Sequence, residues 1–269
     1  MRMVVDSNYL QSPALRTYLS ASPTNYALLT EYTAIEAFKG VQQVIHRSME
    51  LLGEFPEQVI VLIGALEACG LSGERAQDPD GFVDRSQTQG FPEFCRHLAA
   101  ARAGNAHFQG QLAERRVAAV TQMDRILADM PVLTNGFKLV EEGFSPEELK
   151  IIRRREAFTA AMKEKQVVLV LGMAAEMFRT HPSVGAVTRG PEVRDTFIFR
   201  SAVCTFVLAL NEIRHGRAGI AAPGKLRNDV VDLNFATFAT YYDGLLSADN
   251  KAQQIYGDAM TLLNNSFAV

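Results

Sequence analysis

Short apolar runs near the two ends of the chain predict buried strands, because each run is four to six residues long and ends at a polar residue. The runs cover residues 1–5, 25–30 and 244–247. Helical patterns follow all three. Strands that alternate with helices usually form a parallel sheet, so we expect a parallel sheet to which both ends of the chain contribute.

Most other apolar positions recur at helical spacing. The clearest helix start is Ser145-Pro146-Glu147-Glu148, with a capping serine, proline at the first helical position and acids in the first turn. This helix is expected to continue to about Lys165. Residues 58–69 are apolar and fit either a strand or a helix. The other expected helices cover residues 12–20, 30–52 with Thr30 as its cap, 92–130 with breaks near Gly104 and Gly110, 166–180, 194–215, 229–241 and 250–263.

The composition is that of an ordinary globular protein. Its 269 residues are 48% hydrophobic and carry a net charge of -3, so the whole chain is not a basic nucleic-acid binder. No uncharged apolar stretch reaches the roughly 18 residues of a membrane span. Cys69, Cys95 and Cys204 lack zinc-site spacing and fit reduced thiols. We therefore expect a cytoplasmic protein without a membrane partner.

The charge is unevenly distributed. Residues 147–228 contain 14 lysines and arginines and 8 aspartates and glutamates. Moderate asymmetry of this kind is common in helical proteins. The pattern fits chance as well as a basic surface that approaches a polyanion.

Four aspartates stand in an otherwise apolar and aromatic segment, residues 228–249. A solvated acidic face would carry lysines and glutamates between the acids, whereas this segment carries phenylalanines, tyrosines and leucines. We therefore expect it to be buried. Buried carboxylates repel one another and cost several kcal/mol each unless they are paired or bind a metal ion. A divalent cation is the simplest explanation for Asp229, Asp232, Asp243 and Asp249.

Two further acids occupy comparable positions at the other end of the chain. Asp6 follows the first predicted strand as Asp249 follows the last, and Glu36 and Asp232 lie in helices that begin near strand ends. Ligands bind outside the carboxyl ends of the strands in parallel α/β sheets, so these acids are expected to converge. Oxygen ligands suit Mg²⁺ or Mn²⁺ better than Zn²⁺. Two such ions about 3.5–4 Å apart would support phosphodiester cleavage.

Motifs at both ends of the chain resemble those of one family. Val4-Val5-Asp6-Ser7-Asn8 resembles the first motif of PIN-domain nucleases, and residues 29–40, which include Glu36, resemble the second. Residues 232–243 and 247–251 resemble the third and fourth. The resemblance implies an α/β fold, with a PIN-like three-layer α/β/α core, a short parallel sheet and a large helical insertion. The core would comprise residues 1–50 and 225–269, and the helical insertion residues 51–224.

The resemblance also assigns site residues. The catalytic, metal-binding acids would be Asp6, Glu36, Asp232 and Asp249. Asp243 would be a further metal ligand beside them. Asp229 competes with Asp232 for the third position, and we favour Asp232 because its spacing to Asp249 fits a helix, a turn and a strand.

The resemblance predicts a nuclease that depends on Mg²⁺ or Mn²⁺ and hydrolyses phosphodiester bonds, of RNA rather than DNA. The alternatives are a non-catalytic nucleic-acid-binding or protein-interaction module on a PIN-like scaffold, and a metal-dependent phosphatase of small phosphate esters. Nucleic acid, most of all RNA, is the expected partner. A second copy of the chain and a protein inhibitor are left open as partners.

Several smaller features also fit plain structural roles. Ser7, Asn8 and Ser247 fit phosphate binding and fit caps or turns equally well. The Glu212-x-x-His215 spacing occurs in di-iron helices, but the chain offers no second motif of that kind, so we interpret it as structural.

Overall fold

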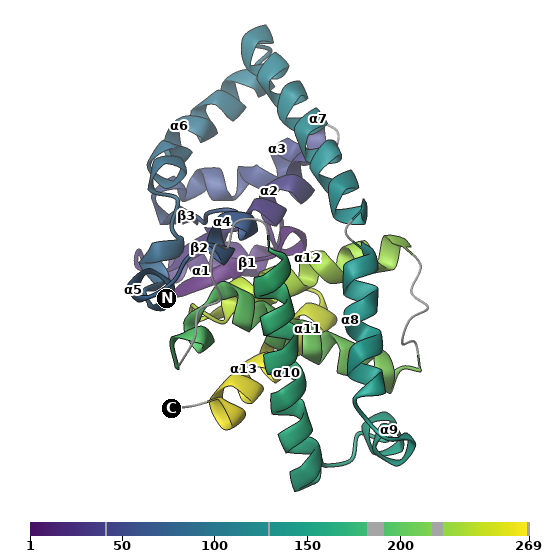
Figure 1. Ribbon diagram of the computed structural model, residues 1–269. Coiled ribbons are helices and arrows are strands. Elements are labelled where there is room, and N and C mark those ends of the chain that lie inside the picture. The colour runs from purple at the N-terminus through teal and green to yellow at the C-terminus, as the bar shows by residue number, and fades with distance from the viewer. Residues whose placement is uncertain (41, 129, 182–190, 217–222, 268–269) are drawn as a thin grey trace.

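The computed structural model describes residues 1–40, 42–128, 130–181, 191–216 and 223–267. In this part of the chain, helices surround a sheet of short strands (Figure 1). The strands are β1 (Arg2–Val5), β2 (Tyr26–Leu29), β3 (Val59–Val61) and β4 (Gly244–Leu246).

All neighbouring strands are parallel, and their order across the sheet is β3-β2-β1-β4. β1 is central and pairs with β2 on one side and β4 on the other. The chain adds β2 and β3 on one side of β1 and later adds β4 on the other side. The direction of winding therefore reverses between β1 and β4. In doubly wound sheets a ligand site lies at such a reversal, outside the carboxyl ends of the two strands.

The sheet lies between two hydrophobic clusters, because alternate residues of each strand point to opposite faces. Val4, Leu28 and Leu245 belong to the cluster that contains the apolar face of helix α12. Val5 and Leu29 belong to the larger cluster, which includes most of the other helices. The expectation of a mixed α/β fold with a short parallel sheet is thereby confirmed.

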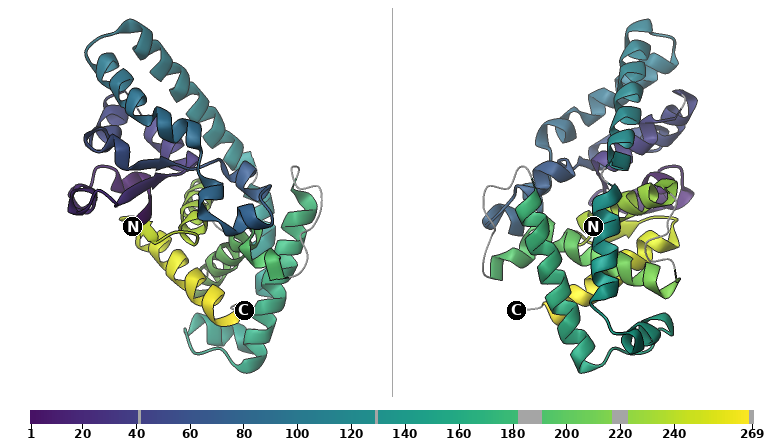
Figure 2. Two further views of the ribbon diagram at one scale, coloured as in Figure 1. Left: turned by 90° about the vertical axis from the view of Figure 1, so that its left-hand side faces the viewer. Right: turned by 45° about the vertical axis from the view of Figure 1, so that its right-hand side comes forward.

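Helices make up most of the described chain. Those closer to the two ends of the chain are α1 (Pro13–Ala21), α2 (Glu31–Phe38), α3 (Gln42–Glu50), α4 (Ala65–Cys69), α5 (Glu74–Gln77), α12 (Pro223–Ala239) and α13 (Asn250–Ser266). The others are α6 (Arg85–Arg102), α7 (Ala106–Ala128), α8 (Met130–Glu142), α9 (Pro146–Arg153), α10 (Ala160–Thr180) and α11 (Phe197–Arg214). α6 and α7 extend together away from the sheet (Figure 2). None of the described helices is long and apolar enough to cross a membrane.

Several expected helix boundaries are confirmed by their caps. The Thr30 side chain caps α2, and the Ser145 side chain caps α9 in a reciprocal arrangement with Glu148. α9 ends much earlier than expected, because Arg155 adopts a positive φ of 58° and the helix cannot continue through it.

Of the two helix breaks expected at glycines, one is present and the other is not. Gly104, with a φ of 99°, separates α6 from α7 as expected. Gly110 lies inside α7 without breaking it, so the expected break there is wrong. A glycine weakens a helix by about 1 kcal/mol but does not end it when its neighbours keep helical geometry.

The sheet takes one strand from the segment that we assigned to the helical insertion. β3 lies within residues 51–224 and pairs with β2 through Leu28 and Ile60. The central helix α11 belongs to the same segment and contacts both α12 and α13. The ambiguous residues 58–69 therefore contain a strand followed by the short helix α4.

Phe238 is expected to be one of the most stabilising side chains beside the sheet. It is fully buried, and its ring centroid lies 4.6 Å from that of Phe197 and 6.3 Å from that of Phe82. Phe238→Ala should lower the free energy of unfolding by about 3–5 kcal/mol, measured by urea denaturation. Val117→Ala is the control: this side chain is 67% exposed, so the change should stay within about 0.5 kcal/mol. Equal effects of the two substitutions would contradict this packing.

Candidate active site

The carboxyl ends of β1 and β4 are joined by hydrogen bonds around Asp6. This residue directly follows β1 and is only 2% exposed. Its Oδ2 accepts hydrogen bonds from Ser247 Oγ and from Asn8 Nδ2, both at 2.6 Å. Asn8 Oδ1 in turn accepts the Ala248 N–H at 2.9 Å. These bonds hold Asp6 at the point where the winding of the sheet reverses. Ser7, Asn8 and Ser247 thus have structural contacts there, whether or not they also bind phosphate.

Helix α2 brings Glu36 to the same place. Ser7 Oγ donates to Glu36 Oε2 and lies 3.3 Å from Asp6 Oδ1. One turn earlier on the helix, Thr33 Oγ1 donates to the Val5 carbonyl at 2.9 Å, which anchors α2 on the end of β1. The other oxygen of Glu36, Oε1, pairs with Lys39 Nζ at 2.7 Å.

Asp249 begins helix α13 just after β4. Its Oδ1 accepts the Lys251 N–H at 2.6 Å, as a helix cap does. Its own N–H donates to Ser247 Oγ at 2.9 Å, and the same hydroxyl donates to Asp6. A single serine therefore links the backbone at Asp249 to the carboxylate of Asp6.

Helix α12 supplies Asp232, which is 9% exposed. α12 packs on both β1 and β4. Burial, together with the negative charges of Asp249 and Asp6, raises the pKa of Asp232 to about 8. Burial also raises the pKa of Asp6, and the charge of Glu36 adds to that effect. Among the described residues, no donor forms a hydrogen bond with the Asp232 carboxylate.

The structure therefore brings the four predicted acids to one edge of the sheet. Hydrogen bonds through Ser7 link Glu36 to the end of β1, and electrostatic interactions link Asp232 to Asp6 and Asp249. Within the described ranges, however, no three acidic, histidine or cysteine side chains already form a metal-ligand group. The carboxylates of Asp6, Glu36 and Asp249 accept hydrogen bonds from protein donors instead.

Asp243 does not belong to this group, and its prediction as a metal ligand is wrong. Asp243 precedes β4, and its Oδ2 accepts the Arg2 N–H at 2.6 Å. Arg2 begins β1, whereas Asp6 follows the end of that strand. The two aspartates thus lie at opposite edges of the sheet, separated by the length of a strand, about 13 Å at 3.3 Å per residue.

Asp229 lies on α12 one turn before Asp232, and its side chain is held by Lys251. The Lys251 ammonium lies 2.5 Å from Asp229 Oδ1 and 3.2 Å from Glu212 Oε1. The sequence places Lys251 in the motif that contains Asp249, but it does not place Glu212 near the site. His215 Nδ1, in turn, contacts the carbonyl oxygen of Asn211 at 2.7 Å.

The donors at this edge fit a hard divalent cation. They are carboxylate oxygens, with hydroxyls beside them, and Mg²⁺ and Mn²⁺ prefer such ligands. Asp232 in particular is a buried carboxylate with like charges around it and no protein donor among the described residues. A bound cation would remove the repulsion that now favours its protonated form.

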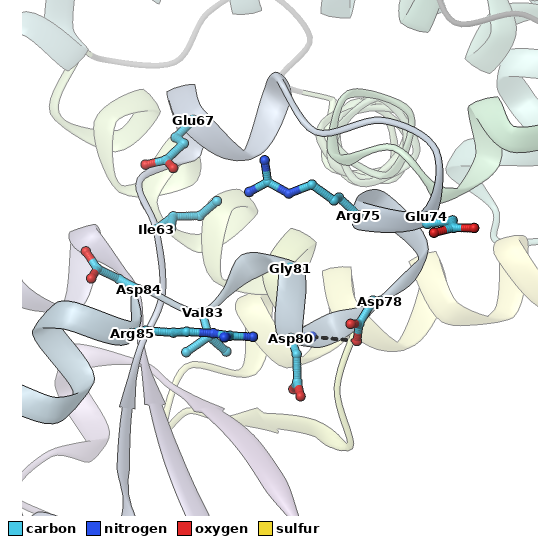
Figure 3. Close-up of a pocket in the computed structure, with 10 residues that line it drawn as sticks. All are labelled: Ile63, Glu67, Glu74, Arg75, Asp78, Asp80, Gly81, Val83, Asp84 and Arg85. Atoms are coloured by element: carbon cyan, nitrogen blue, oxygen red, sulfur yellow. Dashed lines mark hydrogen bonds between the residues drawn. The ribbon is translucent and has the colours of Figure 1, made fainter.

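A pocket of about 590 Å³ lies elsewhere, between α4, α5 and the start of α6 (Figure 3). Five carboxylates and two guanidinium groups line it, and none of the predicted site residues does. Four of these carboxylates are exposed, and the half-buried Asp84 caps α6. Exposed acids can be hydrated, so the lining indicates no particular ligand.

Comparison of the chain with protein-family models, with curated proteins and with solved structures found no match. The order of the strands and the acids that this order brings together are therefore the features that bear on function.

Proposed function

We propose that the protein is a PIN-like nuclease that depends on Mg²⁺ or Mn²⁺ and hydrolyses phosphodiester bonds of single-stranded RNA. The observation that supports this proposal best is the position of four acids from four separate elements. Asp6, Glu36, Asp232 and Asp249 lie at the reversal point between β1 and β4. A doubly wound sheet has its ligand site at this point.

In this proposal the four acids hold the cation, and the polar residues between them hold the acids. A bound divalent cation would lower the pKa of water and stabilise charge on the leaving oxygen. The carboxylates would hold the cation at this edge of the sheet, and one of them would accept the proton of the attacking water. Asn8 and Ser247 fix the Asp6 carboxylate, so little side-chain entropy remains to be lost on binding.

RNA as the preferred substrate and the PIN-like assignment rest on the motifs around Asp6, Glu36 and Asp249. The strand order and the helix-borne position of Glu36 agree with the implied core. The excess of lysine and arginine in residues 147–228 offers positive charge to a polyanion.

The test is cleavage of end-labelled single-stranded RNA, with single-stranded DNA of the same sequence and an RNA duplex beside it. We expect cleavage of the single-stranded RNA with Mn²⁺ or Mg²⁺, and a loss on the order of 10²-fold or more with chelator, since the cation supplies the nucleophile. Electrophoresis of the products gives the rates. A panel of nucleotides and generic phosphate esters is assayed in parallel.

Three outcomes would contradict the proposal. Hydrolysis of small phosphate esters alone would identify a phosphatase. Binding of nucleic acid without cleavage, with no response to Mn²⁺, would identify a non-catalytic module. Cleavage that persists in chelator would show that the acidic site is not responsible.

A further inference from the structure

A separate groove lies at the carboxyl edge of the sheet, on the side of β2 and β3. Its volume is about 610 Å³, and small-molecule sites measure about 300–1,000 Å³. Thr30 and Glu31, which come directly after β2, line it together with Leu62, which directly follows β3. Residues of α2, α6 and α7 complete the lining of this α2–α6–α7 groove, where α6 packs on β3 and α7 packs on α2 (Figure 1). Ligands of parallel α/β sheets bind outside this edge.

Most of the groove lining is apolar, with an aromatic cluster on one side. The ring centroids of Phe91 and Phe94, both on α6, lie 5.8 Å apart, and Phe38 of α2 meets Phe94 edge-on at 6.0 Å. The guanidinium of Arg115, on α7, lies 5.1 Å from the Phe94 ring centroid. Arg115 is exposed, and no acidic side chain of the described chain pairs with it. The groove thus offers aromatic surface to a flat ring and a positive charge to an anion.

Glu31 brings a carboxylate into this largely apolar lining. It is half-buried, and its Oε1 accepts the Ala65 N–H at 2.8 Å. Burial raises the pKa of Glu31, and the Ala65 hydrogen bond opposes that rise. Within the described ranges, no lysine, arginine or histidine pairs with this carboxylate. Each carboxylate oxygen accepts more than one hydrogen bond, so a ligand with neighbouring N–H donors would stabilise the charged form.

A ligand that fits this groove has a flat ring, two neighbouring N–H donors and an anionic group. A guanine nucleotide has all three. The N1–H and the amino group of guanine are adjacent donors on its Watson–Crick edge, whereas the other three RNA bases present one donor beside an acceptor. The phosphate supplies the anion that an arginine binds.

We propose that the α2–α6–α7 groove is a guanine-nucleotide site, in which the Glu31 carboxylate accepts hydrogen bonds from the base edge and Arg115 contacts the phosphate. A free nucleotide and a guanosine of an RNA strand present the same chemistry to these two residues. The site needs none of the four acids and no metal ion, so this inference goes beyond the proposed function.

Gly90 of α6 allows the groove to be filled while the fold is kept. It lines the groove, and a Cβ at this position would meet no heavy atom of the described chain within 4 Å beyond its neighbours in the helix. Gly90→Leu should fold, because leucine favours a helix over glycine, and should weaken the binding of guanosine monophosphate at least tenfold. Gly110→Leu is the matched control, since Gly110 is an equally open position of α7 that does not line the groove.

Isothermal titration calorimetry of the full chain, with a chelator present, compares guanosine and adenosine monophosphate. We expect the guanine nucleotide to bind tighter by on the order of tenfold or more. Glu31→Gln keeps an acceptor for the Ala65 N–H but should bring the two affinities within about twofold. Arg115→Met should weaken guanosine monophosphate more than guanosine, which has no phosphate. An oligoadenylate with one guanosine and the same strand without it show whether RNA can supply the base.

Equal affinities for the two nucleotides would overturn the inference, and so would binding that a folded Gly90→Leu protein retains. Absence of binding by both nucleotides and both RNAs would overturn it as well. A preference for guanine in the RNA pair, or in the free nucleotides alone, supports the site and identifies the source of the base. If circular dichroism shows that Gly90→Leu does not fold, the response of Glu31→Gln decides. A failure of RNA cleavage would contradict only the proposed function, because these affinities are measured without metal ions.

Discussion

Asp6→Asn is expected to lower the metal-dependent cleavage of RNA by on the order of 10²–10³-fold while the protein stays folded. Asp6 lies at the end of β1, directly at the reversal of winding, and hydrogen bonds from Ser247 and Asn8 fix its carboxylate. Asparagine keeps the shape of the side chain but removes the negative charge that a divalent cation needs. Initial rates with saturating Mn²⁺, together with the far-ultraviolet circular dichroism of the variant, measure both parts of the expectation.

Asp243→Asn is the matched control for this substitution. It changes the same atoms in a residue that the sequence also suggested as a ligand, but at the amino end of the sheet. The asparagine oxygen can still accept the Arg2 N–H, so we expect the cleavage rate to change by less than about twofold. If both variants lose cleavage equally, or if Asp6→Asn retains full activity, the active site does not lie where we place it.

The two edges of the sheet show what the sequence can predict about the site. Strand and helix patterns predict Asp6 and Asp249 after strands: Asp6 directly follows β1, and Asp249 lies three residues beyond the last residue of β4. Parallel neighbouring strands then have their carboxyl ends at one edge, so the convergence of these acids follows from the pattern itself. The fold class could be predicted for the same reason.

Asp243 shows where this reasoning fails. Its proximity to Asp249 in the sequence suggested proximity in the site, but β4 lies between them. A strand moves the chain across the whole sheet, so residues before and after it lie at opposite edges. An acid that precedes a parallel strand is therefore a poor candidate for a site at the carboxyl edge.

The contact between Glu212 and Lys251 could not be found from local patterns for a different reason. They meet through the packing of α11 against α13, at a sequence separation of 39 residues. A buried ion pair between two helices produces no characteristic residue spacing in the sequence, because the register of one helix against the other is set by tertiary packing. The apolar face of α11 predicts a buried helix. An acidic residue within such a face, here Glu212, indicates that a buried partner lies nearby.

The pH dependence of stability is expected to report on Asp232 in the metal-free protein. Its pKa is raised to about 8 by burial and by the charges of Asp249 and Asp6, whereas an aspartate in the unfolded chain titrates near 4. Between these two values the folded protein binds a proton that the unfolded chain does not. The free energy of unfolding should therefore fall as pH rises, by about 1.4 kcal/mol per pH unit from this group. Above pH 8 both states are ionised, and the loss stays constant.

Urea denaturation of the chelated protein and of Asp232→Asn at pH 6, 7, 8 and 9 measures this effect. The difference in unfolding free energy between the two proteins reports on Asp232 and its coupling to Asp6 and Asp249, because groups remote from Asp232 titrate alike in both. We expect Asp232→Asn to gain stability relative to the unmodified protein as pH rises to about 8, and the difference then to level off. Saturating Mn²⁺ should remove most of this trend, because the cation replaces the proton on the carboxylate. A difference that does not change with pH would mean that Asp232 is ionised and compensated without a metal ion, and would remove the electrostatic basis for placing a cation beside it.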